Sequence, residues 1–124
     1  MAEDILKKLR KAEDGLSTYE YIANNIGNCD ELMPALVENM INVDRNGQFV
    51  VSTARYLHAI DAEKYADAID ALVKAAIDKD REHKYIPELL SSLWGADYAE
   101  HAEELSAKDD NFRRIYKRVF QKGI

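Results

Sequence analysis

Apolar residues recur at spacings of three and four along most of the chain, in a succession of short segments. The clearest segments are Tyr19–Ile26, Ile86–Leu93 and Phe112–Phe120. Residues spaced in this way share one face of an α-helix, because the helix has about 3.6 residues per turn. The strict alternation of a half-buried strand is absent, apart from a brief run at residues 49–51. The pattern therefore predicts an all-α protein.

Turn and capping residues divide this pattern into about seven or eight helices. Gly15 ends the first helix, Pro34 suits a first helical turn, and residues 44–47 form a turn. Ser17 and Asp97 each precede a glutamate by three residues, which is the spacing of a capping box. The predicted helices cover about residues 3–13, 17 to a stop at 24–27, 30 or 34 to 41, 48–60 and 62–78. A sixth helix has Pro87 at its start or within it and ends at Trp94, and two more cover about residues 97–105 and 109 or 110 to 122.

Short connectors between these helices restrict the architecture. Consecutive helices must lie antiparallel or cross at steep angles. Two arrangements satisfy this requirement: antiparallel helical hairpins stacked as a short α-solenoid, or a compact multi-helix bundle. The helix at 48–60 is apolar on more than one side, so we expect it to be central. A chain of 124 residues suits a single helical domain spanning residues 1–124.

Two segments of the chain match each other position by position. Residues 33–40 and 86–93 each begin with an apolar residue and a proline and continue as an amphipathic helix, displaced by 53 residues. Each segment resembles the proline-bearing helix of HEAT and armadillo repeats, although their usual repeat is about 40 to 47 residues. The resemblance covers about eight residues twice. It implies a helical-repeat fold and a role in binding other macromolecules.

Composition and cysteine content fit a globular cytoplasmic protein. Hydrophobic residues make up 47% of the chain and charged residues 32%. No apolar run approaches the roughly 20 residues of a membrane span, and the N-terminus lacks the layout of a signal peptide. The single cysteine, Cys29, cannot form an internal disulfide, which suits a reducing compartment. We therefore expect a cytoplasmic protein with no membrane partner.

Charge is distributed unevenly along this acidic chain, whose net charge is −6. Residues 15–107 carry seventeen acidic and seven basic side chains, whereas residues 108–124 carry six basic and two acidic ones. The basic positions include Arg113, Arg114, Lys117 and Arg118. Cations near a helix C-terminus complement the helix dipole, and this interpretation is preferred. Self-association with the acidic body of another copy is a second interpretation, and nucleic-acid binding is the least favoured.

Nothing in the sequence predicts a catalytic residue, a cofactor or a metal. Among His58, His83 and His101, only His83 follows a carboxylate by three residues, and it lies in the most polar stretch of the chain. A di-metal bundle needs that spacing twice, with further inward carboxylates. Phosphate-binding glycine loops and nucleophile motifs are absent. We therefore predict that the protein is not an enzyme.

Aromatic residues suggest where a partner would bind. Most of the seven tyrosines lie at or beside an apolar stripe, which suits the boundary between core and water. Tyr85, Trp94 and Tyr98 lie close to Gly95, and we predict a protein-binding surface there. The leading interpretation is a non-catalytic interaction protein of adaptor or scaffold type, with a homodimer left open. The alternative is a small-molecule or metal site between helices, using His58 or His101.

Overall fold

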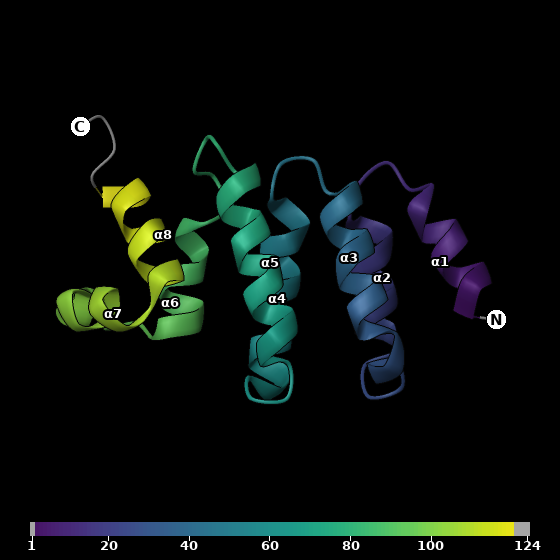
Figure 1. Cartoon of the computed structure of the whole chain (residues 1–124), viewed down its shortest axis with the longest axis horizontal. Coiled ribbons are helices and arrows are strands. Elements are labelled where there is room, and N and C mark those ends of the chain that lie inside the picture. The colour runs from purple at the N-terminus through teal and green to yellow at the C-terminus, as the bar shows by residue number, and fades with distance from the viewer. Residues whose placement is uncertain (1, 121–124) are drawn as a thin grey trace.

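The computed structural model describes residues 2–120 and confirms an all-α protein (Figure 1). Within this range the chain forms eight α-helices and two short 3₁₀ helices, with no strand. The α-helices are α1 (Ala2–Arg10), α2 (Leu16–Asn24), α3 (Met33–Val43), α4 (Gln48–Asp61), α5 (Ala66–Lys79), α6 (Pro87–Trp94), α7 (Ala102–Lys108) and α8 (Asp110–Phe120). The 3₁₀ helices are η1 (Asp30–Leu32) and η2 (Tyr98–His101).

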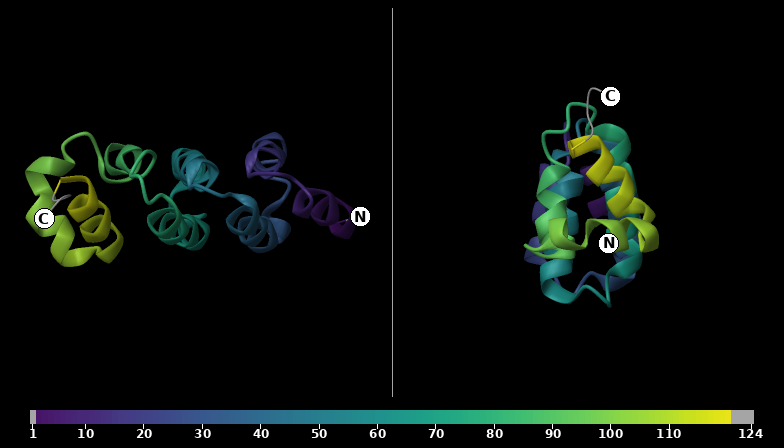
Figure 2. Two further views of the ribbon diagram at one scale, coloured as in Figure 1. Left: turned by 90° about the horizontal axis from the view of Figure 1, so that it is seen from above. Right: turned by 90° about the vertical axis from the view of Figure 1, so that its left-hand side faces the viewer.

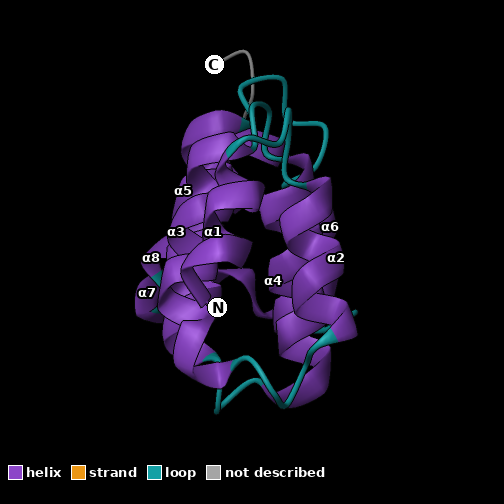
Figure 3. Ribbon diagram, turned by 90° about the vertical axis from the view of Figure 1, so that its right-hand side faces the viewer, coloured by secondary structure: helices purple, strands orange, loops and turns teal. Residues whose placement is uncertain are grey.

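The helices form two layers in a row. Seen along the row, α1, α3, α5 and α8 lie on one side and α2, α4 and α6 on the other (Figure 3). Within the layers α3 packs against α1 and α5, α5 against α8, and α4 against α2 and α6. Across the layers α2 packs on α3, α4 on α5, and α6 on α8. The row therefore consists of helical hairpins side by side, with α1 and α8 at opposite ends (Figures 1 and 2).

The hydrophobic core lies between the two layers. The α4 helix buries Val50, Val51, Thr53, Ala54 and Leu57, which confirms its predicted central position. Its neighbour α5 buries six apolar side chains. In the last hairpin α6 buries two leucines and α8 buries an aromatic and an aliphatic residue. The largest fully buried side chains, each under 2% solvent-exposed, are Phe112, Ile22, Leu36, Met40, Leu57, Leu72, Ile77, Ile86, Leu89, Leu90, Ile115 and Val50.

Two buried aspartates cap the helices that follow them. Asp44 accepts hydrogen bonds from the backbone N–H groups of Phe49 and Val50, at 3.0 and 2.8 Å. Asp80 accepts from the corresponding groups of Tyr85 and Ile86, at 2.6 and 2.8 Å, and also from the N–H of Lys84. Both aspartates are 2% exposed. A buried aspartate that caps the next helix therefore occurs both between α3 and α4 and between α5 and α6.

The two capped loops also have similar sequences, displaced by 36 residues. Residues 44–50 read Asp-Arg-Asn-Gly-Gln-Phe-Val, and residues 80–86 read Asp-Arg-Glu-His-Lys-Tyr-Ile. The fourth residue of each, Gly47 and His83, has a positive φ, of 93° and 58°. By contrast, the two proline segments at residues 33–40 and 86–93 belong to α3 and α6, which lie in opposite layers. The 53-residue displacement therefore does not relate equivalent positions in the row.

Several predicted helix ends are wrong, each for a local reason. The first helix ends at Arg10 because the next two N–H groups turn back to bond carbonyls three residues earlier. Ser17 and Asp97 form no capping box: Ser17 lies inside α2, after the N-cap residue Gly15, and the Asp97 side chain accepts no capping hydrogen bond at the start of η2. The fifth helix begins at Ala66, four residues late, because residues 62–65 form a turn. The predicted end of the last helix at 122 lies outside the described residues.

Candidate functional site

A groove of about 570 Å³ runs between α3 and α5 on the outer face of their layer. Both helices contribute one stripe of side chains, and η1 and the turn before α5 close one end. The α3 stripe is Met33, Pro34, Val37, Glu38 and Ile41; the remaining lining residues are Asp30, Lys64, Tyr65, Asp67, Ala68 and Ala71. Successive α3 positions are alternately one and three residues apart, so they lie on one face of the helix and the groove follows the helix axis.

Small side chains on α5 keep this groove open. Ala68 and Ala71 stand where larger residues would fill the space between the two helices. Opposite them, Met33 and Val37 are each 5% exposed and form an apolar floor that is continuous with the core. An apolar hollow of this kind suits apolar side chains from a ligand, because their burial removes hydrocarbon surface from water.

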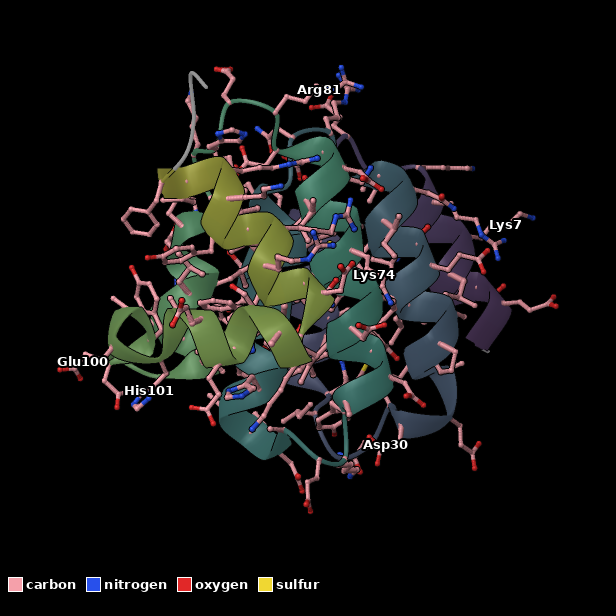
Figure 4. All side chains as sticks on the ribbon, turned by 60° about the vertical axis from the view of Figure 1, so that its left-hand side comes forward. Lys7, Asp30, Lys74, Arg81, Glu100 and His101 are labelled. Carbon is pink, nitrogen blue, oxygen red and sulfur yellow. The ribbon has the colours of Figure 1, made fainter. Side chains whose placement is uncertain are left out.

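A polar cluster closes the groove where η1 meets the turn before α5. The Lys64 ammonium lies 2.8 Å from the Asp30 carboxylate. The hydroxyl of Tyr65 donates a hydrogen bond to the same carboxylate at 3.0 Å. The Lys64 Nζ atom also lies 5.2 Å from the centroid of the Tyr65 ring, within reach of a cation–π contact. Figure 4 shows Asp30 at the lower end of the layer, with Lys74 further along α5.

These contacts shift the pKa values of all three groups. The hydrogen bond from Lys64, with a second from Tyr65, lowers the pKa of Asp30. The same hydrogen bond raises the pKa of Lys64. Burial, together with the hydrogen bond to Asp30, raises the pKa of Tyr65. All three shifts hold the ion pair charged and the phenol neutral near pH 7, so the cluster is suited to positioning rather than proton transfer.

The two long walls of the groove carry unneutralised negative charge. Glu38 on α3 and Asp67 on α5 are exposed, and neither makes an ion pair with a residue in the described range. The third carboxylate that lines the groove is occupied, because Asp30 pairs with Lys64. An apolar floor between two free carboxylates is therefore the main chemical feature of this groove.

The aromatic residues that were predicted to bind a partner pack partly against other residues of the same chain. The Trp94 ring meets Phe112 edge-on at 5.2 Å, and its Nε1–H donates to Asp109 at 2.9 Å. Tyr98 meets Phe112 at 6.3 Å. Tyr85 lies at the other end of α6, half-buried, next to the Asp80 cap. The structure thus joins Trp94 and Tyr98 in one cluster and leaves Tyr85 apart from them.

The basic cluster of α8 is largely engaged within the molecule. Arg113 pairs with Asp110, and Arg114 lies 3.5 Å from the carboxylate of Asp78 on α5. Arg118 donates to the backbone carbonyl of Ile77, also on α5. Lys117 is exposed. The contacts of Arg114 and Arg118 connect α8 to α5, and with the pair inside α8 they account for three of the four cations.

The histidines occupy separate places. His101 lies 3.2 Å from Asp97, and with Glu100 these side chains form the one group of possible metal ligands found in the described part of the chain. All three are exposed, at the end of the molecule away from Lys7 (Figure 4). His58 is half-buried, and His83 lies in the Asp80 loop. The expected metal site using His58 or His101 therefore has ligands gathered only at His101.

The sequence interpretation did not identify the α3–α5 groove. Its lining comes from two helices whose pairing no local pattern specifies. Ala68 and Ala71 lie in an alanine-rich helix, and small side chains allow a neighbouring helix to approach closely, but the sequence does not indicate which helix that is. The two Asp-Arg loops were the available signal, because one follows α3 and the other, 36 residues later, follows α5.

Within the described residues no helix is long and apolar enough to span a membrane. Comparison of the chain with known protein families, curated proteins and solved structures yields no match.

Proposed function

We propose that the protein is a non-catalytic interaction protein that holds a segment of a partner polypeptide in the α3–α5 groove. The observation that carries the proposal is the groove itself: an apolar hollow of about 570 Å³ with free carboxylates on both walls. Sites of this size, mostly apolar with a few polar groups, are typical of ligand recognition. The groove contains no nucleophile paired with a base, which favours binding over catalysis.

The arrangement of the helices supports the same proposal. Helical hairpins placed side by side present long surfaces on each layer, which repeat proteins use to bind other macromolecules. The HEAT and armadillo resemblance and the cytoplasmic location expected from the sequence stay predictions and agree with it. The surface near Tyr85, Trp94 and Tyr98 also stays a prediction, but the groove offers more apolar surface that is not already used within the chain.

Site-specific photocrosslinking tests this proposal. The photoreactive amino acid p-benzoylphenylalanine replaces Glu38 on the exposed wall of the groove, or Glu20 on α2 in the other layer as the control, and the protein is irradiated in the cells from which it comes. Both glutamates are exposed, so each position accepts the probe without disturbing the core. We expect a defined adduct from position 38 and none of that mass from position 20.

A second substitution makes the result specific to the groove. Ala68→Leu, on the wall opposite Glu38, reduces the space available in the groove. It should abolish the position-38 adduct while the far-ultraviolet circular dichroism spectrum stays unchanged. The same adducts from both positions, or an adduct that persists with Ala68→Leu, would overturn the proposal.

A further inference from the structure

We infer that the segment held in the α3–α5 groove is a short amphipathic helix whose apolar stripe is flanked by lysine or arginine. This inference rests on the proposed function and specifies the chemistry of the partner. It follows from three properties of the groove: the nature of its walls, its length and its charge.

The walls favour a helix over an extended segment. Both are α-helices, whose backbone N–H and C=O groups are already bonded within each helix. An extended segment would therefore find no sheet edge to pair with and would leave its own backbone groups against apolar side chains, at a cost in free energy. A helical segment satisfies its backbone internally and presents only side chains to the groove.

The dimensions of the groove fit about two helical turns. Along α3 the apolar lining runs from Met33 through Val37 to Ile41, a separation of eight residues. At a rise of about 1.5 Å per residue this is roughly 12 Å. Ala68 and Ala71 on the other wall are small enough to let a third helix approach closely. A partner with apolar residues at i, i+3, i+4 and i+7 would fill this length.

Charge selects a basic partner. Glu38 and Asp67 lie on opposite walls, so a helix between them would bring a cation on either flank within reach of a carboxylate. Lys64 does not offset them, because its charge is paired with Asp30 at 2.8 Å. The surrounding body at residues 15–107 is itself acidic. Acidic flanks of the partner would meet like charge on both sides.

A second copy of this chain does not supply such a helix from its described residues. The basic helix α8 buries Phe112 and Ile115 in its own core and uses three of its cations on α5 and Asp110. The basic helix α1 buries Leu6 and Leu9 against the rest of its own chain. The apolar face of each is therefore already covered, which points to a different protein as the partner.

Three fluorescein-labelled peptides of 16 residues test the inference by fluorescence anisotropy. They share one leucine stripe at i, i+3, i+4, i+7 and i+8, and their flanking positions are lysine, glutamine or glutamate. We expect affinity to fall in the order lysine, glutamine, glutamate. Two exposed ion pairs correspond to roughly a three- to tenfold preference for the lysine peptide over the glutamine peptide at low salt. A fourth peptide, the lysine version with a central proline, should bind more weakly because it cannot stay helical.

Matched variants assign the effects to the groove. Glu38→Gln combined with Asp67→Asn should remove most of the lysine preference, whereas Glu20→Gln, an exposed glutamate on α2 in the other layer, should leave it intact. Ala71→Leu should weaken binding of every peptide, and Ala107→Leu should not. Circular dichroism confirms that each variant is folded.

The outcomes separate this inference from the proposed function. If the lysine and glutamate peptides bind equally but Ala71→Leu weakens both, the groove stands as a binding site and the basic character of its partner is wrong. If the proline peptide binds as well as its parent, the helical character is wrong. If Ala71→Leu has no more effect than Ala107→Leu, the groove itself is not the site, and the proposed function fails with the inference.

Discussion

Gly47 shows how one residue serves both the turn in which it lies and the neighbouring hairpin. Its φ of 93° places it in the left-handed region, and a Cβ atom there would lie 2.9 Å from the Cβ of Asp80. Asp80 belongs to the equivalent loop of the next hairpin. The absence of a side chain at Gly47 therefore lets the two capped loops lie against each other.

Replacing Gly47 by alanine should destabilise the protein through both effects. A positive φ costs a non-glycine residue about 1–2 kcal/mol, and the close contact with Asp80 adds to it. We expect Gly47→Ala to lower the free energy of unfolding by about 2–3 kcal/mol, as measured in urea.

Gly27 provides the matched control. It has a similar φ of 87°, but a Cβ there would meet nothing within 4 Å. Gly27→Ala should therefore cost only the backbone part, about 1–2 kcal/mol. Equal losses for the two variants would contradict the role of the contact with Asp80.

The Asp30 ion pair predicts a contribution to stability that depends on pH. Because its partners lower the pKa of Asp30 in the folded state, its contribution is present above the unfolded pKa of about 3.9. The contribution is lost as the pH falls through the lower folded pKa. Asp30→Asn should therefore lower the free energy of unfolding at pH 7. Below about pH 4 the free energy of unfolding of this variant should fall less steeply with pH than that of the wild type, as measured by urea titrations at several pH values.

Asp67→Asn is the control for this prediction. Asp67 is an exposed aspartate of the same groove that makes no ion pair in the described part of the chain. The free energy of unfolding of Asp67→Asn should fall in acid as steeply as that of the wild type. An unchanged decline in Asp30→Asn would show that the ion pair with Lys64 does not form in solution.

At the scale of the helices, Asp109 joins α6 to the start of α8. One carboxylate oxygen accepts from the indole N–H of Trp94, and the other accepts from the backbone N–H of Phe112. Asp109→Ala removes a helix cap and leaves the half-buried indole without this acceptor. We expect a loss of about 2 kcal/mol in the free energy of unfolding.

The single tryptophan reports the local change directly. Trp94 fluorescence should shift to longer wavelength in Asp109→Ala as the indole becomes more exposed to water. Asp110→Ala, at the next position, removes only an exposed pair with Arg113 and should leave the emission unchanged. A shift of equal size in both variants would mean that the indole contact is not what holds the two helices together.

The sequence predicts where most of the helices lie along the chain, but it does not predict which helices pack against each other. The predicted range 48–60 agrees with α4 within one residue, and the predicted end of the sixth helix at Trp94 agrees with α6, because apolar periodicity and turn residues act locally. The caps of α2 and η2 were wrong, since the side chain that bonds the first N–H of α2 is Asp14 rather than Ser17. The groove depends on α3 lying beside α5, which is a property of the packed row.

At the scale of the whole molecule, position in the row should determine local stability. The end helix α1 has a neighbour on one side only, whereas α4 lies between α2 and α6 and packs extensively on α5 (Figure 1). Repeat-like arrays gain stability from each neighbouring interface. We therefore expect the amide hydrogens of α1 to exchange with solvent fastest and those of α4 to exchange slowest, by hydrogen exchange with mass spectrometry. Uniform protection from α1 to α5 would contradict this expectation.

The layout of the row also determines how the protein should respond to mechanical force. Because α1 and α8 lie at opposite ends, a pull applied between them acts along the row and across the helix axes (Figures 1 and 2). The load would then separate one hairpin from the next in turn, beginning at an end, rather than break all interfaces at once. The protein should therefore extend at low force in several small steps. The central α3–α5 groove should be among the last parts to open.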